Sequence, residues 1–252
     1  ETIVTDVHPF LGISFSCGTI DDIVQLIVDA ARGDRTKMLV TPNVHHVVAL
    51  DRQLPPETVA TYLSADLFLC DSKVLGRLGR WSGLALTPRT GTDRVADVLA
   101  APGNRDLVIA MAGPSEVQAE AMASRFPDWR FQLIETPARL VPGTEEWRKT
   151  VAMAAEGDWQ ILLSCLSFPK QELFAADVRA ARRNKGGVIL CVGAAVDFLS
   201  GTLPRAPDGW QRLGLEWLHR LLSEPRRLWR RYLLDGPKVF LIYLRQRRSG
   251  SS

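Results

Sequence analysis

The chain has 252 residues, of which 46% are hydrophobic and 23% are charged, so it is long enough and apolar enough to bury a globular core. Its net charge of +3 excludes a polycation, and no apolar run approaches the ~20 residues that a membrane-spanning helix needs. No signal peptide is recognisable at the start, and the four cysteines are scattered singly, which favours free thiols in a reducing, cytoplasmic setting.

Helical and strand-like segments alternate over residues 1–201. A helix is predicted over 19–33, where apolar residues recur at helical spacing between Thr19 as N-cap and Gly33 as stop. Buried strands are predicted over 37–43, 66–70, 106–113, 159–166 and 186–193, and further helices over 57–65, 115–126 and 170–183. Short apolar strands that alternate with amphipathic helices predict an α/β fold with a largely parallel sheet and flanking helices.

The pattern changes after Gly201. Two short helices are predicted, separated by Pro225, with Ser223 as the cap of the second and Gly236 as its end. From Leu203 onward there are eleven Arg or Lys and four Asp or Glu, an excess of seven positive charges that leaves a net −4 for the residues before it. This segment is either a solvated basic helix or an appendage that meets something anionic.

Three polar clusters follow predicted strands, namely TPNVHH (41–46), DSK (71–73) and SFPKQE (167–172). In open parallel sheets ligands bind outside the carboxyl ends of the strands, so these clusters predict a site. Asp71 can serve as a general base, or it can cap the turn or helix that follows it. Thr41 and Asn43 can orient a substrate hydroxyl, or they can form a turn around Pro42.

Two further segments leave alternatives open in the same way. Gln171 and Glu172 can bind sugar hydroxyls, or they can simply open a helix. In the polar loop 89–94, Thr92 or Asp93 can be no more than the N-cap of the next helix.

The absence of several motifs narrows the chemistry. The sequence has neither G-x-G-x-x-G nor G-x-x-x-x-G-K-[ST], which disfavours a nucleotide-cofactor enzyme. It has no D-x-D pair to hold a divalent ion against a diphosphate, and the adjacent His45 and His46 would point in different directions, so no metal site is predicted. Neutralising a diphosphate without a metal would require arginines.

A long motif occupies residues 192–233, where RAP-x-x-W-x-x-x-GLEW is followed by EP-x-R-L-x-R-RY. The shorter motifs that precede it are LGISFSCGTIDDIVQLI (11–27), VTPN (40–43), RTGTDRV (89–95) and FPKQE (168–172). On these motifs the chain resembles the WecG/TagA/CpsF glycosyltransferases (glycosyltransferase family 26) over nearly its whole length.

The resemblance implies inverting, metal-independent and cofactor-free transfer of a hexose from a UDP-sugar to a polyprenyl-diphosphate-linked sugar. The hexose would be N-acetylmannosamine, its uronic acid or glucose, and the reaction would take place on the inner face of the cytoplasmic membrane. The implied fold is a Rossmann-like body of the GT-E type over residues 1–201. Residues 202–252 would form an appendage that helps to close the active site and touches the membrane.

The resemblance also assigns roles by motif. Asp71 matches the proposed base, and three arginines of the appendage match a diphosphate clamp. The full set of substrate-binding matches is Thr41, Asn43, Arg89, Gln171, Arg220, Arg227 and Arg230. Ser72 and Lys73 depart from the family, which usually has a glycine-containing turn after the aspartate.

The remaining basic and aromatic residues of the appendage fit a surface for anionic lipid. The apolar run Val239–Leu244 is too short to cross a bilayer. The residues expected to contact the membrane are Arg226, Trp229, Arg231, Arg245, Arg247 and Arg248.

A non-catalytic basic module that binds anionic lipid or nucleic acid is the alternative function. Tryptophans at core-like helical spacing in the tail, and the lack of a known nucleic-acid motif, argue against nucleic acid. The family contains oligomers, so the resemblance allows a homo-oligomer.

Overall fold

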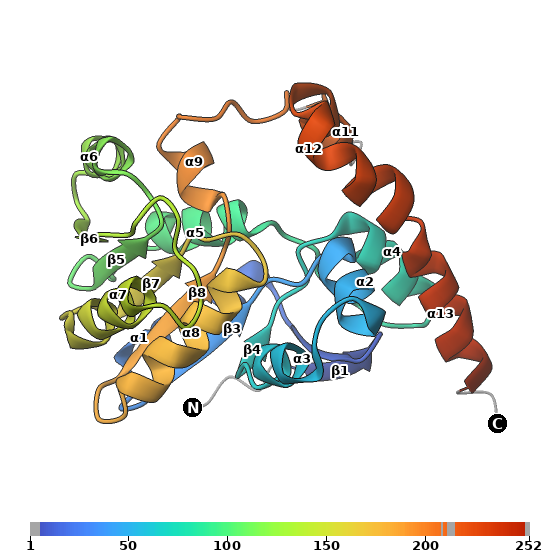
Figure 1. The fold of residues 1–252 in the computed structure, drawn as a ribbon, viewed down its shortest axis with the longest axis horizontal. Coiled ribbons are helices and arrows are strands. Elements are labelled where there is room, and N and C mark those ends of the chain that lie inside the picture. Colours follow the sequence, from blue (N-terminus) through green and yellow to red (C-terminus); the bar gives the residue numbers. More distant parts are fainter. Residues whose placement is uncertain (1–5, 208, 211–214, 250–252) are drawn as a thin grey trace.

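The computed structural model describes residues 6–207, 209–210 and 215–249 (Figure 1). Within these residues, six strands form a parallel sheet in the order β4-β3-β8-β7-β5-β6. Their bounds are Thr36–Val40 (β3), Leu67–Phe68 (β4), Val108–Ala112 (β5), Arg130–Ile134 (β6), Ile161–Ser164 (β7) and Gly187–Cys191 (β8). The predicted α/β fold with a Rossmann-like, largely parallel sheet is confirmed.

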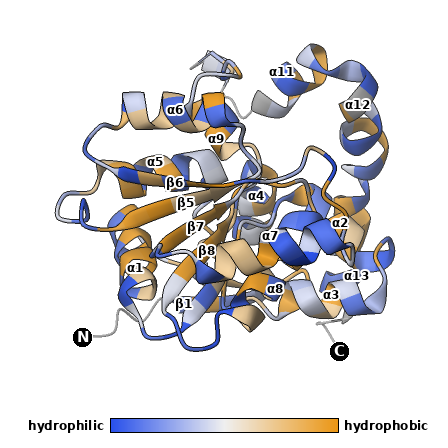
Figure 2. Cartoon of the chain, turned by 60° about the vertical axis from the view of Figure 1, so that its left-hand side comes forward, coloured by the Kyte–Doolittle hydropathy of each residue, from blue (hydrophilic) through white to orange (hydrophobic). Residues whose placement is uncertain are grey.

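Helices cover both faces of the sheet, because the side chains of every strand alternate between two apolar clusters. In β3, Met38 and Val40 belong to one cluster, whereas Leu39 belongs to the other. Figure 2 shows strands β5–β8 as an apolar layer between the helices. The first cluster packs on α2 (Val44–Arg52), α3 (Pro56–Leu63), α4 (Lys73–Trp81), α7 (Glu145–Glu156) and α8 (Lys170–Ala181). The second packs on α1 (Ile20–Arg32), α5 (Gly91–Ala100), α6 (Glu116–Arg125) and α9 (Ala195–Leu199).

An antiparallel hairpin precedes the sheet and was not predicted from the sequence pattern. Its strands are β1 (Asp6–Phe10) and β2 (Ile13–Cys17), joined by a two-residue turn. Both turn residues have positive φ, +52° at Leu11 and +77° at Gly12, as a type I′ turn requires. Leucine is an unusual residue for that conformation, so the Leu-Gly pair gave no turn signal.

The appendage continues from α9 and crosses above the sheet before it descends beside α4 (Figure 1). It contains α11 (Glu216–Ser223), α12 (Pro225–Trp229), a π-helical segment η1 (Arg230–Asp235) and α13 (Lys238–Ser249). The predicted break at Pro225 and the end of a helix at Gly236 are confirmed. The predicted cap is wrong, because Ser223 donates to the carbonyl oxygen of His219 at 2.9 Å and closes α11 instead.

The appendage is attached to the body at both of its ends. Near its start, the guanidinium of Arg205 pairs with Asp93 at 2.9 Å. Near its end, α13 buries Val239 and Tyr243 against the body, and the Oε1 atom of Gln246 accepts a hydrogen bond from the backbone N–H of Leu11 at 2.9 Å. The helices between these two attachments are therefore held over the carboxyl edge of the sheet. The domain boundary expected at residue 201 stays a prediction.

Arg182, at the end of α8, is a buried side chain with several backbone partners. It donates to the carbonyl oxygens of Ala155, Gly157, Trp159 and Gly186 at 2.5–3.2 Å, and its guanidinium lies 3.9 Å from the ring centroid of Trp159.

Replacing Arg182 with Ala should lower the free energy of unfolding by about 3 kcal/mol, because buried carbonyl groups would lose their donors. Urea denaturation followed by circular dichroism measures the change. The exposed neighbour Arg183 provides the control, and Arg183→Ala should shift the free energy by less than about 0.5 kcal/mol. Equal effects of the two substitutions would contradict the assigned role.

Candidate active site

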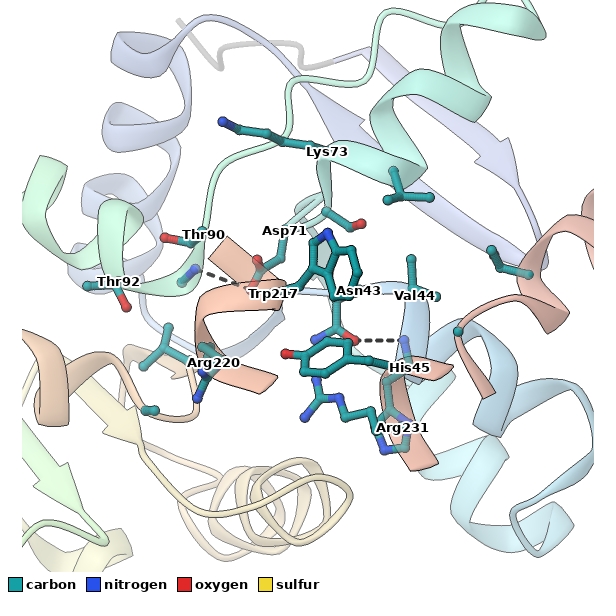
Figure 3. Close-up of a pocket in the computed structure, with 18 of the residues that line it drawn as sticks. Asn43, Val44, His45, Asp71, Lys73, Thr90, Thr92, Trp217, Arg220 and Arg231 are labelled. Atoms are coloured by element: carbon teal, nitrogen blue, oxygen red, sulfur yellow. Dashed lines mark hydrogen bonds between the residues drawn. The ribbon is translucent and has the colours of Figure 1, made fainter. Parts of the chain in front are cut away.

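The register of β3 with its two neighbours creates the candidate site. Val40 pairs with both Phe68 of β4 and Cys191 of β8, so the residues that follow these three strands emerge at one edge of the sheet. Two adjoining cavities of about 460 Å³ and 570 Å³ lie there, between the body and the appendage. Figure 3 shows the residues that line the smaller one. The residues that line both cavities are Asn43, His45, Asp71, Val192, Ala194, Arg220 and Arg231.

Asp71 lies where the two cavities meet. Its backbone N–H donates to the carbonyl oxygen of Pro42 at 3.0 Å, and its carboxylate accepts a long hydrogen bond of 3.4 Å from the N–H of Gly91, the first residue of α5. The helix that follows Asp71 is capped by Ser72, whose hydroxyl accepts from the N–H of Leu75. Ser72, and not Asp71, is therefore the N-cap of that helix.

Three predicted polar residues also lie at this edge, and each makes a structural hydrogen bond. Thr41 donates to the carbonyl oxygen of Cys191 at 2.9 Å. Asn43 caps α2 by accepting from the N–H groups of His45 and His46 at 2.9 Å and 3.3 Å. The Oε1 atom of Gln171 accepts from the N–H of Gly193 at 2.8 Å. Each of these three side chains therefore both makes a local structural hydrogen bond and lines the cleft.

Arg89 is not among the residues that line either cavity. Its guanidinium forms a two-point ion pair with Asp97 of α5, and this hydrogen-bonded carboxylate raises the pKa of Arg89. Its backbone N–H donates to the carbonyl oxygen of Cys70 at 2.9 Å, so Arg89 fixes the position of the 89–94 loop. The expectation that its side chain reaches the substrate is not supported by this placement.

The loop after Arg89 also differs from expectation. The N-cap of α5 is Thr90, whose hydroxyl accepts from the N–H of Asp93 at 3.1 Å, so neither Thr92 nor Asp93 is the cap. Thr92 lines the smaller cavity, and Asp93 forms the ion pair with Arg205.

Two appendage arginines reach the cleft, and only one of them, Arg220, belongs to the three expected for the clamp. Arg220 and Arg231 line both cavities, whereas Arg230 is exposed and its guanidinium lies 5.6 Å from the ring centroid of Trp229. The expected inward placement of Arg230 and outward placement of Arg231 are thus wrong. The side chain of Arg227 lies outside the described part of the structure.

The reason is the backbone path between the arginines. Glu224, with a φ of −133° and a ψ of 60°, separates α11 from α12. A π-helical segment then begins at Arg230, and its i→i+5 hydrogen bonds change the number of residues per turn. These two changes alter which side chains face the sheet.

His45 is a cleft residue that sequence reasoning considered only as a metal ligand. Burial and the nearby charge of Arg231 lower the pKa of His45 to about 4, so its imidazole is neutral at pH 7. Its Nδ1 atom is buried and has no hydrogen-bonding partner among the described residues. The available signal was its position two residues after the cap Asn43, which fixes it at the sheet edge. In the described part of the chain, no group of three or more His, Cys, Asp or Glu side chains is placed to hold a metal ion.

An open parallel sheet whose carboxyl edge holds a carboxylate opposite two arginines defines an α/β enzyme of the Rossmann-like class. Residues 8–252 match the model of the glycosyl transferase WecG/TagA/CpsF family. The chain therefore belongs to this family and is a glycosyltransferase of polysaccharide biosynthesis, acting on a sugar donor and an acceptor. Across the described residues, no helix has both the length and the hydropathy to cross a bilayer.

Proposed function

We propose that the protein transfers a hexose from a UDP-sugar to a polyprenyl-diphosphate-linked sugar, with inversion and without a metal ion. The observation that carries the proposal is the arrangement of Asp71, Arg220 and Arg231 around one cleft at the carboxyl edge of the sheet (Figure 3). Inversion needs a base beside the acceptor hydroxyl on one face of the sugar. It also needs cationic groups around the leaving diphosphate on the other.

Asp71 has the surroundings of a general base. The N–H of Gly91 points at its carboxylate from the N-terminal end of α5, where the helix dipole favours negative charge. The buried guanidinium of Arg94 attracts the same carboxylate. A carboxylate at this position can take the proton of the acceptor hydroxyl as the glycosidic bond forms, a contribution of typically 10²–10⁴-fold in rate.

Arg220 and Arg231 are suited to the leaving diphosphate. Guanidinium groups stay charged at physiological pH and bind phosphate oxygens through two parallel hydrogen bonds. Charge develops on the diphosphate as the sugar departs, so cations fixed on the opposite wall from the base stabilise the transition state more than the ground state.

The two cavities suit the two substrates. The larger one is lined by polar groups such as Thr41, Gln171 and Asp197, which suit a nucleotide sugar. The smaller one lies under the appendage and is lined by apolar groups such as Val44, Trp217 and Phe240, which suit a lipid-linked acceptor. Asp71 borders both cavities, so in this assignment the base faces the hydroxyl and the anomeric carbon together.

The outer side of the appendage supports contact with an anionic membrane surface. Large apolar side chains of the appendage are exposed at Trp229, Leu233, Leu234, Leu241 and Leu244. Arg226, Arg247 and Arg248 are exposed beside them. Of the other expected membrane residues, Arg231 lies in the cleft and Arg245 pairs with Asp51. An amphipathic surface of this kind binds in the plane of the headgroups.

Asp71→Asn should lower the turnover number by 10²–10⁴-fold and leave UDP binding nearly unchanged, because only the proton acceptor is lost. UDP release is measured with UDP-N-acetylmannosamine, its uronic acid and UDP-glucose, each with a polyprenyl-diphosphate-linked sugar acceptor. Full turnover by the variant would overturn the assignment of the base. No release by the wild-type protein with any of the three donors would overturn the proposed reaction.

Arg231→Ala should lower the turnover number on the order of 10²-fold, as removal of one charge-stabilising donor does in comparable sites. Arg230→Ala is the matched control one residue earlier, and it should change turnover by less than about threefold because its guanidinium points to solvent. Steady-state kinetics with the productive donor compares the two. A larger loss of turnover in Arg230→Ala than in Arg231→Ala would contradict this assignment and favour Arg230 as the clamp residue, as expected from the sequence.

The double substitution Leu241→Glu and Leu244→Glu should reduce partitioning onto phosphatidylglycerol-containing vesicles at least about tenfold, since two exposed leucines would no longer enter the interface. Co-sedimentation with vesicles measures it. Leu63→Glu with Val117→Glu adds the same charge at exposed apolar positions of the body and serves as the control. Equal losses in the two double variants would show that charge alone, not the appendage surface, governs binding.

A further inference from the structure

A chain of buried polar groups lies beneath the larger cavity, and one of them, Glu172, has no role in the reaction described above. It starts at Glu172 of α8, whose side chain is only 1% exposed. The Oε1 atom of Glu172 accepts a hydrogen bond of 2.8 Å from the Nε2 atom of Gln171. Its Oε2 atom is buried and has no hydrogen-bonding partner among the described residues. Burying a carboxyl oxygen without a hydrogen bond destabilises the folded state, which suggests that Glu172 has a function next to the cleft.

The hydrogen bonds lead from Glu172 to the wall of the cleft. The Oε1 atom of Gln171 accepts a hydrogen bond of 2.8 Å from the backbone N–H of Gly193. Gly193 has a positive φ of +54°, and its neighbours Val192 and Ala194 line both cavities. A glutamine amide can be turned by 180°, which exchanges its donor and acceptor ends. Only the orientation with nitrogen toward Glu172 places oxygen toward the Gly193 amide.

We propose that Glu172 is a positioning residue of the cleft: its carboxyl oxygen fixes the amide of Gln171 in the one orientation that holds the Gly193 segment against both cavities. The proposal deepens the proposed function and rests on it for the identity of the bound donor. Replacement of Glu172 by a side chain without an acceptor frees the Gln171 amide to turn, and the Gly193 N–H then loses its partner.

The groups that face Glu172 leave its charge uncompensated. The Nδ1 atom of His46 of α2 is 4.0 Å from Oε1, and burial, followed by the charge of Arg231, lowers the pKa of His46 well below its usual value. Tyr62 of α3 bonds His46 at 3.1 Å and, like Cys191 of β8, has a pKa raised by burial. Burial correspondingly raises the pKa of Glu172 to about 7.

The sign of the resulting pH dependence follows from linkage. The ordinary pKa of the carboxyl is 4.5, so between about pH 4.5 and 7 the folded protein holds a proton on Glu172 that the unfolded chain has lost. The contribution of Glu172 to the free energy of unfolding therefore falls as the pH rises through this window. Glu172→Gln keeps an acceptor oxygen but cannot ionise, so it removes this contribution.

The first test follows the Gly193 amide without any ligand, by NMR hydrogen exchange in the full chain. Glu172→Ala should raise its exchange rate about three- to tenfold, the worth of one hydrogen bond. Glu172→Gln should stay within about twofold of wild type. Glu120→Gln, on the exposed surface of α6, is the control. Unchanged exchange in Glu172→Ala, or equal increases in both Glu172 variants, would overturn the proposal.

The second test is the pH profile of stability, which remains informative even where Glu172→Ala fails to fold. The urea midpoint of wild type relative to Glu172→Gln should fall between pH 5 and pH 8, while Glu120→Gln should follow wild type. Parallel profiles of wild type and Glu172→Gln would contradict the proton on Glu172 and overturn this part of the proposal.

The third test uses the KM for the productive UDP-sugar, which Glu172→Ala should raise about three- to tenfold and Glu172→Gln should leave within about twofold. An unchanged KM in Glu172→Ala would overturn the link to the donor. If no UDP-sugar supports transfer while the Gly193 exchange behaves as expected, the proposed reaction fails and the positioning by Glu172 stands.

Discussion

The parallel register of β3 with both of its neighbours is the constraint on which the rest of the structure depends. Because Val40 lies opposite Phe68 and Cys191, the polar residues after three separate strands emerge at one height. A slip of one residue would turn each strand's side chains to the opposite face and mix the two apolar clusters. The sheet thus fixes Thr41, Asp71 and Gly193 together, and no loop needs to be long to bring them there.

The negative and positive charges of the cleft come from different parts of the chain, the body and the appendage. Asp71 follows β4 of the body, and its carboxylate accepts a hydrogen bond from the backbone N–H of Gly91. Arg220 and Arg231 come from helices of the appendage, which contacts the body through the Arg205–Asp93 ion pair, the hydrogen bond between Gln246 and Leu11 and a hydrogen bond between Gln53 and Asp235. A base and a cationic clamp on one rigid element would neutralise each other through a short ion pair. On opposite walls they can act on opposite sides of the bond that breaks.

The sheet and the location of the site could be predicted because strand and helix periodicity is a local property that each segment carries by itself. The hairpin β1–β2 could not be predicted, because its turn places Leu11 in the left-handed region and matches no common turn motif. The ion pair of Arg89 with Asp97 could not be predicted, because that contact exists only in the folded helix. The inward placement of Arg231 could not be predicted, because it depends on the π-helical segment that begins at Arg230, which residue spacing does not indicate.

The placement of charge in the appendage has a consequence beyond the cleft. An excess of seven positive charges after residue 202 faces a net −4 on the rest of the chain, so the molecule is an electric dipole. Near an anionic surface such a dipole turns its positive end toward the surface before the two make contact. The effect extends over the screening length, which is about 8–10 Å at ordinary ionic strength. The appendage, and the cleft that it roofs, therefore arrive at such a surface first, and salt governs how often an encounter begins in that orientation.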